Sequence, residues 1–160
     1  MKDLVALLGH LGCDEVTTCI QSGNVVFRAP VRTARRLGRE LPSAIEESRG
    51  FRPEVLVLDP ARLERVVAEN PFPEAVEDPK FLHVGFLAAV PERPDLAGLG
   101  ELREPSERFE LIGDHFYMHV PEGVGRSKLA AQAEKRLGVG LTHRNWRTVM
   151  KIRHLVEARA

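Results

Sequence analysis

The chain lacks the features that mark secreted, membrane and metal-binding proteins. Its 160 residues include only two cysteines, which match no metal or redox motif, and Cys19 lies in a strand-like run where a small buried apolar residue is expected. No apolar run approaches the length that spans a bilayer. Asp3 and the helical spacing of the leucines that follow it argue against a signal peptide. We therefore expect a cytoplasmic protein with no membrane partner.

The motifs of common catalytic sites are missing as well. No Cys/His or Ser/His/Asp arrangement, carboxylate pair, dinucleotide fingerprint or Walker A loop occurs at a recognisable spacing. Ser22 and Ser127 lack the pattern of a nucleophile elbow. His115 and His119 of one strand are too far apart to share a metal ion without further ligands. The sequence leaves any catalytic residues unidentified, and it predicts no cofactor and no metal.

Net charge is also absent, but the balance hides an asymmetry. The 23 basic residues equal the 23 acidic ones, so the formal charge is zero. From Val120 to the end, nine residues are basic and three are acidic, which leaves residues 1–119 with a net charge of −6. Regions of opposite sign either attract each other within the chain or present a basic face to an anionic partner.

Hydrophobic periodicity predicts interleaved helices and strands. The first half reads as a helix over 4–11 ended by Gly12, a hairpin of 16–20 and 25–27, a helix from Thr33 that Pro42 kinks or restarts, a strand over 55–58, and a helix from Pro60. The second half reads as a strand over 81–87, a short helix over 95–100, a hairpin of 109–112 and 115–120, a helix over 127–137, an extended piece over 139–144 and a helix from Trp146.

This order predicts an α+β fold rather than a parallel sheet. The second half fits β–α–β–β–α–β, the ferredoxin-like unit, and the first half fits the same unit without its opening strand. We therefore expect two ferredoxin-like subdomains: an incomplete one with its following helix over 1–70, a proline-bearing acidic connection over 71–80, and a second with a terminal helix over 81–160.

The stretch from Pro121 to Leu129 is the strongest candidate for a binding site. Gly123 and Gly125 let the backbone turn sharply, and Ser127 is placed to cap the helix that follows. Unpaired N–H groups and the dipole of a helix N-terminus attract anions, whereas the alternative is a plain strand-to-helix connection with solvated basic side chains. The predicted anion-binding residues are Gly125, Arg126, Ser127, Lys128, Arg144, Asn145, Arg147 and Lys151.

Two further groups are secondary candidates. Gln21, Ser22 and Asn24 of the first hairpin turn could offer polar contacts, although backbone angles alone explain such a turn. His115, Tyr117 and His119 alternate with apolar residues along one strand and could form an open sheet face for stacking bases, or a merely solvated face. Of these, Tyr117 and His119 are the candidate binding residues. Trp146 is expected to anchor the last helix in the core, with Asn145 or Thr148 as its cap.

Four motifs resemble one known family. They are Gln21–Ser22–Gly23–Asn24–Val25–Val26–Phe27, Asn70–Pro71–Phe72, Gly125–Arg126–Ser127–Lys128–Leu129 and Arg144–Asn145–Trp146–x–Thr148. Together they resemble the uncharacterised bacterial "domain of unknown function 1697" family over essentially the whole chain. The resemblance implies the fold and no biochemical activity.

That family usually begins with a strand and a glycine-containing turn, whereas this sequence starts inside the first helix. In a ferredoxin-like unit the opening strand is central, so the predicted strand over 55–58 would lack a partner. We expect a longer natural chain, or another segment or a second copy in a homodimer, to fill that gap.

Three functions are compatible with these observations. The first is a binding module for phosphate-bearing ligands, a nucleotide or a nucleic acid, which uses the basic C-terminal region. The second is an enzyme that acts on a small anionic metabolite through residues that the sequence does not reveal. The third is a plain interaction or structural protein.

Overall fold

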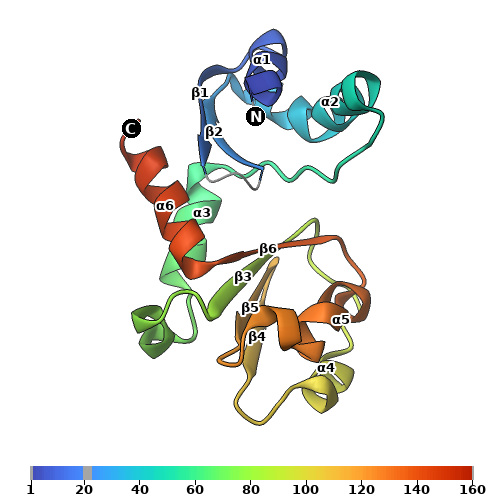
Figure 1. Cartoon of the computed structure of the whole chain (residues 1–160), viewed down its shortest axis with the longest axis vertical. Helices are drawn as coiled ribbons and strands as arrows, with labels where there is room; N and C mark the ends of the chain where they lie inside the picture. Colours follow the sequence, from blue (N-terminus) through green and yellow to red (C-terminus); the bar gives the residue numbers. More distant parts are fainter. Residues whose placement is uncertain (1, 20–22, 160) are drawn as a thin grey trace. The chain divides into compact units, whose positions relative to one another are not determined.

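The computed structural model describes residues 2–19 and 23–159 (Figure 1). These residues form a mixed α+β structure with two antiparallel sheets, which confirms the predicted fold class. The elements follow in the order α1 (Lys2–His10), β1 (Asp14–Cys19), β2 (Asn24–Arg28), α2 (Val31–Arg49), α3 (Pro60–Ala68), η1 (Pro73–Glu77), β3 (Leu82–Leu87), α4 (Leu96–Leu102), β4 (Arg108–Ile112), β5 (His115–His119), η2 (Val124–Arg126), α5 (Lys128–Leu137), β6 (Leu141–Asn145) and α6 (Trp146–Glu157).

The chain divides into two compact units. Unit 1 comprises Met1–Pro60 and Lys151–Ala160, and unit 2 comprises Ala61–Met150. The division therefore falls inside α6, whose first five residues belong to unit 2. The subdomain boundaries expected from the sequence, at 71–80, stay a prediction.

Unit 2 is built on a four-stranded sheet with the strand order β4-β5-β3-β6. Its elements follow the chain as β3–α4–β4–β5–α5–β6, so the first and last strands of this series are neighbours. The strand β3 pairs antiparallel with both β5 and β6, and every one of its residues is buried. An apolar strand with two partners and two covered faces has all its main-chain groups and side chains removed from water.

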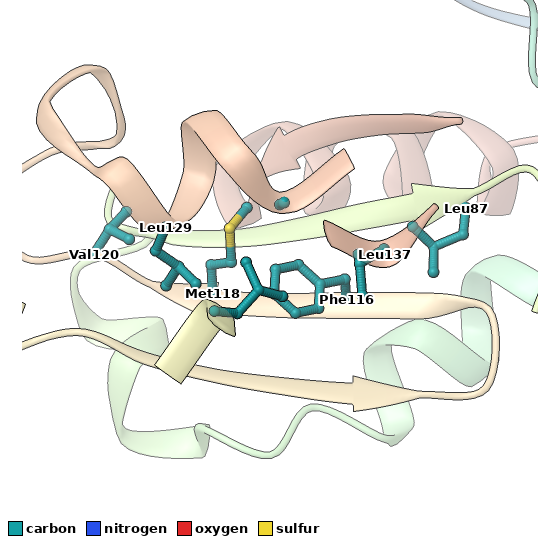
Figure 2. Packing of buried hydrophobic residues seen from close by; sticks show 8 residues of the cluster. Leu87, Phe116, Met118, Val120, Leu129 and Leu137 are labelled. Atoms are coloured by element: carbon teal, nitrogen blue, oxygen red, sulfur yellow. The ribbon is translucent and has the colours of Figure 1, made fainter. Parts of the chain in front are cut away.

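The core of unit 2 lies between the sheet and α5. Phe116 and Met118 of β5 lie against Leu129 and Leu137 of α5, and all four side chains are at most 1% exposed (Figure 2). The i, i+4 and i+8 spacing of the buried residues of α5 puts them on one helical face. Gly138, with φ 73°, ends this helix in the left-handed conformation that glycine adopts without strain.

The opposite face of the sheet is covered by α3. Tyr117 is fully buried, and its hydroxyl donates a 2.9 Å hydrogen bond to the Val66 carbonyl of α3. His115, on the same face, is 1% exposed. The prediction of an open face along this strand is therefore wrong at these two residues. Alternation of side chains fixes which residues share a face but not whether a helix from elsewhere covers it.

Unit 1 packs α1 and α2 against the hairpin of β1 and β2. Its core contains Leu8 of α1, Cys13, and Leu37 and Leu41 of α2. The C-terminal residues reach the same hairpin, because Arg159 donates to the Thr17 hydroxyl and to the Glu15 carbonyl. The predicted hairpin is thus confirmed in its two strands.

In this unit, the alternative of a helix restart at Pro42 and the predicted strand over 55–58 are wrong. The helix α2 continues through Pro42, so no separate helix begins there; Leu37 and Leu41 bury one continuous face. Residues 55–58 form no strand within the described chain, although Val55 and Val57 pack against the core in an extended segment. A strand exists only through a partner, and β1 and β2 pair with each other.

Candidate functional site

The loop before α5 has the geometry that its glycines predict. Gly123 has φ 95°, in the left-handed region, and the short helix η2 follows it. Ser127 is the cap of α5, as predicted, since its hydroxyl oxygen accepts the Ala130 N–H at 3.0 Å. Ser127 is buried, whereas Gly125 and the two basic side chains beside it, Arg126 and Lys128, are exposed.

The start of α6 is capped in the same way. The Asn145 side-chain oxygen accepts the Thr148 N–H at 2.9 Å, which confirms Asn145 as the cap and leaves its amide NH₂ for other partners. Trp146 is 6% exposed, so it lies in the core as predicted. Arg147 is exposed, and the half-buried Arg144 donates to the His143 carbonyl at 2.8 Å. Burial lowers the pKa of the Arg144 guanidinium from its ordinary value.

Strand pairing brings these two helix starts to one end of the sheet. Both β5 and β6 run antiparallel to β3, so they are parallel to each other and both end where β3 begins. Leu129 of α5 packs with Val120, just beyond β5, and α6 follows β6 directly. We call this region the basic end, and it comprises Gly125, Arg126, Ser127, Lys128, Arg144, Asn145 and Arg147.

The basic end has an excess of positive charge. Among the described residues, no carboxylate lies within ion-pair distance of Arg126, Lys128 or Arg147. Lys151, the remaining predicted site residue, is exposed in the part of α6 that belongs to unit 1, and its role in the site stays a prediction. The basic end thus combines solvated cations with the positive ends of two helix dipoles.

The secondary candidates lie elsewhere. Tyr117 is buried and hydrogen-bonded to α3. His119 lies beside Arg108, with Nδ1 at 3.3 Å from a guanidinium nitrogen, and burial followed by the Arg108 charge lowers its pKa. Asn24 is buried in the hairpin of unit 1, where its amide donates to the Cys19 carbonyl at 3.4 Å. Gln21 and Ser22 lie outside the described residues.

A second polar cluster joins α3 to the β4–β5 turn. Arg62 donates from Nε to His115 Nε2 at 3.2 Å and from Nη2 to the Leu87 carbonyl at 2.9 Å, and it pairs with the Asp114 carboxylate at 3.1 Å. Burial lowers the pKa of His115, against the opposing effect of the Asp114 charge. An open depression of about 340 Å³ borders this cluster, with Arg65 and Glu69 on its wall. Sequence spacing gave no signal for it, because Arg62 and His115 are 53 positions apart.

A pair of histidines lies on the α5 face of the sheet. The Nδ1 atoms of His83 and His143 are 3.3 Å apart, and the two ring centroids are 5.3 Å apart. His83 is 5% exposed, and its Nε2 is 3.1 Å from the Lys80 carbonyl oxygen. Neither histidine was among the residues predicted from the sequence to belong to a site. The predicted β–α–β–β–α–β order held the signal, because it makes the strands of these two residues neighbours.

Two features are absent from the described residues. No described helix is long and apolar enough to cross a membrane. In the same part of the chain, no group of three or more His, Cys, Asp and Glu side chains is arranged to hold a metal ion.

Comparison with known proteins identifies a family. The model of the family described as "Protein of unknown function (DUF1697)" matches residues 1–117. Two of the four motifs, and the whole basic end, lie beyond the matched residues. No curated protein and no solved structure matches the chain. The match covers most of the sequence, and the chain therefore belongs to the DUF1697 family of uncharacterised proteins.

Proposed function

We propose that the chain is a binding module for phosphate-bearing ligands, a nucleotide or a nucleic acid, and that the basic end is its binding surface. The observation that carries this proposal is the meeting of two helix N-termini and exposed cations at one end of one sheet. Each helix start alone is a common feature. Their convergence at one end of the sheet, after the two parallel strands that flank β3, is what supports a ligand site.

The chemistry of this region suits a phosphate better than a single carboxylate. A phosphate group has several oxygens that can be shared among N–H groups and cations, and it carries more charge than a carboxylate at neutral pH. Arg126 and Arg147 can each present a planar pair of donors, and Lys128 adds a compact charge. The Ser127 hydroxyl accepts from Ala130, so its own proton is left to donate.

We further propose that β3–α4–β4–β5–α5–β6 is a ferredoxin-like unit. Its element order and its antiparallel strand order β4-β5-β3-β6 support this assignment. In such a unit the loop after the third strand and the end of the fourth strand lie at the same end of the sheet. The fold thus supports one continuous binding surface rather than two separate ones.

The test removes the two cations of the loop and α5. We expect Arg126→Ala with Lys128→Ala to weaken binding of ATP and of a labelled single-stranded oligonucleotide roughly tenfold or more, since each cation contributes a charge-assisted contact. The matched control is Arg93→Ala with Lys135→Ala. These exposed residues carry the same charge, but Arg93 follows the C-terminal end of β3 and Lys135 lies in the last turn of α5, away from the basic end. Binding is measured by fluorescence anisotropy and calorimetry.

Salt dependence separates the two ligand classes. If the ligand is a single-stranded nucleic acid, removal of two phosphate contacts should reduce the slope of log affinity against log salt by about 1.4. If the ligand is a nucleotide, ATP should bind more tightly than the oligonucleotide and show the weaker salt dependence. Equal weakening by both double variants, or no binding of either ligand by the parent, would refute the proposal.

A further inference from the structure

We propose that Arg62, Asp114 and His115 form an acid-sensitive latch, which holds α3 on the sheet of unit 2 at neutral pH and loosens it in mild acid. The inference is independent of the basic end as a phosphate site. It rests on the hydrogen bonds of Arg62, on the tautomer that they impose on His115 and on the depression that these residues border.

Arg62 attaches the first turn of α3 to the sheet. Its Nη2 donates to the Leu87 carbonyl at 2.9 Å and to the Asp114 carbonyl at 3.3 Å, and it lies 3.1 Å from the Asp114 carboxylate. Its Nε donates to His115 Nε2 at 3.2 Å. Water screens these contacts only in part, because the Arg62 side chain is mostly buried. A single guanidinium thus joins α3 to the end of β3 and to the β4–β5 turn.

The bond from Arg62 fixes the tautomer of His115. A guanidinium only donates hydrogen bonds, so His115 Nε2 is the acceptor and the proton of the neutral ring is on Nδ1. The Asp114 carboxylate lies 3.3 Å from the same Nε2 atom. His115 Nε2 therefore faces one donor and one acceptor, and its protonation decides which of them it binds.

Protonation of His115 reverses this choice. The imidazolium donates from Nε2 to the Asp114 carboxylate and no longer accepts from Arg62. The Arg62 Nε–H loses its acceptor, and two cations then face each other in a site where His115 is buried. Asp114 is also shared between both cations. Acid therefore weakens the attachment of α3 at Arg62.

The surroundings of His115 set the pH at which this change occurs. Burial is the largest cause that lowers the pKa of His115, and the charges of Arg62 and Arg65 on α3 lower it further. The charges of Asp114 and Glu69 act in the opposite direction, and β3 contributes an uncharged aromatic ring. We expect α3 to be attached above about pH 6.5 and to loosen as the pH falls toward the pKa of the folded state.

A second attachment of α3 does not titrate in this range. The Tyr117 hydroxyl donates to the Val66 carbonyl at 2.9 Å, one helical turn after Arg62. Burial raises the pKa of Tyr117, so its phenol keeps its proton. Acid should therefore loosen the first turn of α3 and leave the next turn attached. The depression of about 340 Å³ beside Asp114 and His115 is then the place where water enters.

The test is amide hydrogen exchange of the full chain, followed by NMR from about pH 7.5 to about pH 5 and corrected for the intrinsic effect of pH on exchange. We expect exchange in α3 to rise roughly three- to tenfold relative to α5, as the loss of one hydrogen bond requires. His115→Gln should abolish this rise, because the Gln oxygen accepts from Arg62 without titrating. His119→Gln, on the same strand and face, is the matched control and should behave as the parent does.

A second measurement uses the parent alone. In ¹⁵N spectra of the imidazole nitrogens, His115 should carry its proton on Nδ1 at neutral pH, and its titration should have the same midpoint as the change in α3. An Nε2 proton at neutral pH, exchange in α3 that does not depend on pH, or an unchanged response in His115→Gln would show that the cluster is only a structural contact. The spectra decide the question if His115→Gln does not fold.

Discussion

The two units cover their sheets in different ways. Unit 2 encloses β3 between β5 and β6 and covers its sheet with α3 on one face and α5 on the other. Unit 1 has a sheet of only two strands, whose side chains pack with those of α1 and α2. A two-stranded hairpin is marginal by itself, so unit 1 depends on its helices for order.

The polar groups of the two units differ as well. Ion pairs of unit 1, such as Arg28–Glu15 and Arg52–Glu46, join side chains that are at least half exposed. Unit 2 has exposed pairs too, such as Lys80–Asp78, but the side chains of its Arg62–Asp114 pair are only 15% and 26% exposed. Water screens the exposed pairs, so they contribute little to stability. The Arg62–Asp114 pair is screened less, and removal of one partner leaves a partly buried charge without its counterion. We therefore expect stability and pH dependence to be concentrated in unit 2.

Truncation of the two cores should give the largest contrast. Phe116→Ala removes a fully buried ring beneath α5 and should lower the free energy of unfolding by about 3–5 kcal/mol. Leu41→Ala, at a residue 7% exposed in unit 1, should cost about 2 kcal/mol, because its smaller site can relax. Urea unfolding followed by Trp146 fluorescence and circular dichroism measures both. An equal or larger cost for Leu41→Ala would contradict the ranking of the cores.

Removal of one partner from each kind of ion pair should give the next contrast. Arg62→Ala leaves the Leu87 carbonyl and the Asp114 carboxylate without this donor and should cost about 2 kcal/mol. Arg52→Ala in unit 1 removes exposed contacts to Glu46 and Ser43 and should cost less than about 1 kcal/mol. The same unfolding experiments compare the two variants. Similar costs would mean that the exposure of an ion pair does not determine its contribution to stability.

Acid should destabilise the fold through its buried histidines. The folded state holds the pKa of His115 below its ordinary value, chiefly by burial, so below about pH 6.5 the unfolded chain binds more protons than the folded one. The contribution of His115 to stability is therefore complete above that pH, and it is lost as the pH drops toward the pKa of the folded state. His115→Gln should lose less stability between neutral and mildly acidic pH than the parent, as measured by urea unfolding. An unchanged pH dependence would exclude His115 as a contributor.

Helix capping should give the smallest contrast. Ser127→Ala removes the acceptor of the Ala130 N–H and should cost about 1 kcal/mol. Ser48→Ala, inside α2 of unit 1, removes only an exposed bond from the Ser48 hydroxyl to the Ile45 carbonyl and should be near neutral. Thermal unfolding measures both changes. A cost at Ser48 equal to that at Ser127 would indicate a general effect of the substitution.

Local structure could be predicted from the sequence where neighbouring residues determine it. The cap at Ser127 and the two strands of the first hairpin, β1 and β2, depend on a few adjacent residues, and both were predicted. The helical stripes of α1 and α5 were predicted for the same reason, since their periodicity is visible in the chain itself.

Features that depend on residues distant in the sequence were not predicted. The apolar run at 55–58 has the composition of a strand, but hydrogen bonds from another segment decide whether it becomes one. The face of Tyr117 was expected to be open, because nothing in its own strand reveals that α3 covers it.

The candidate sites divide in the same way. The sequence by itself determined the charges and the helix starts of the basic end, because caps, glycines and basic residues lie within short stretches. Only the tertiary structure decided that β5 and β6 end side by side with β3, that Arg62 reaches His115, and that His83 meets His143. The two side-chain contacts join residues more than fifty positions apart, and the free energy that fixes them comes from the pairing and burial of the whole sheet.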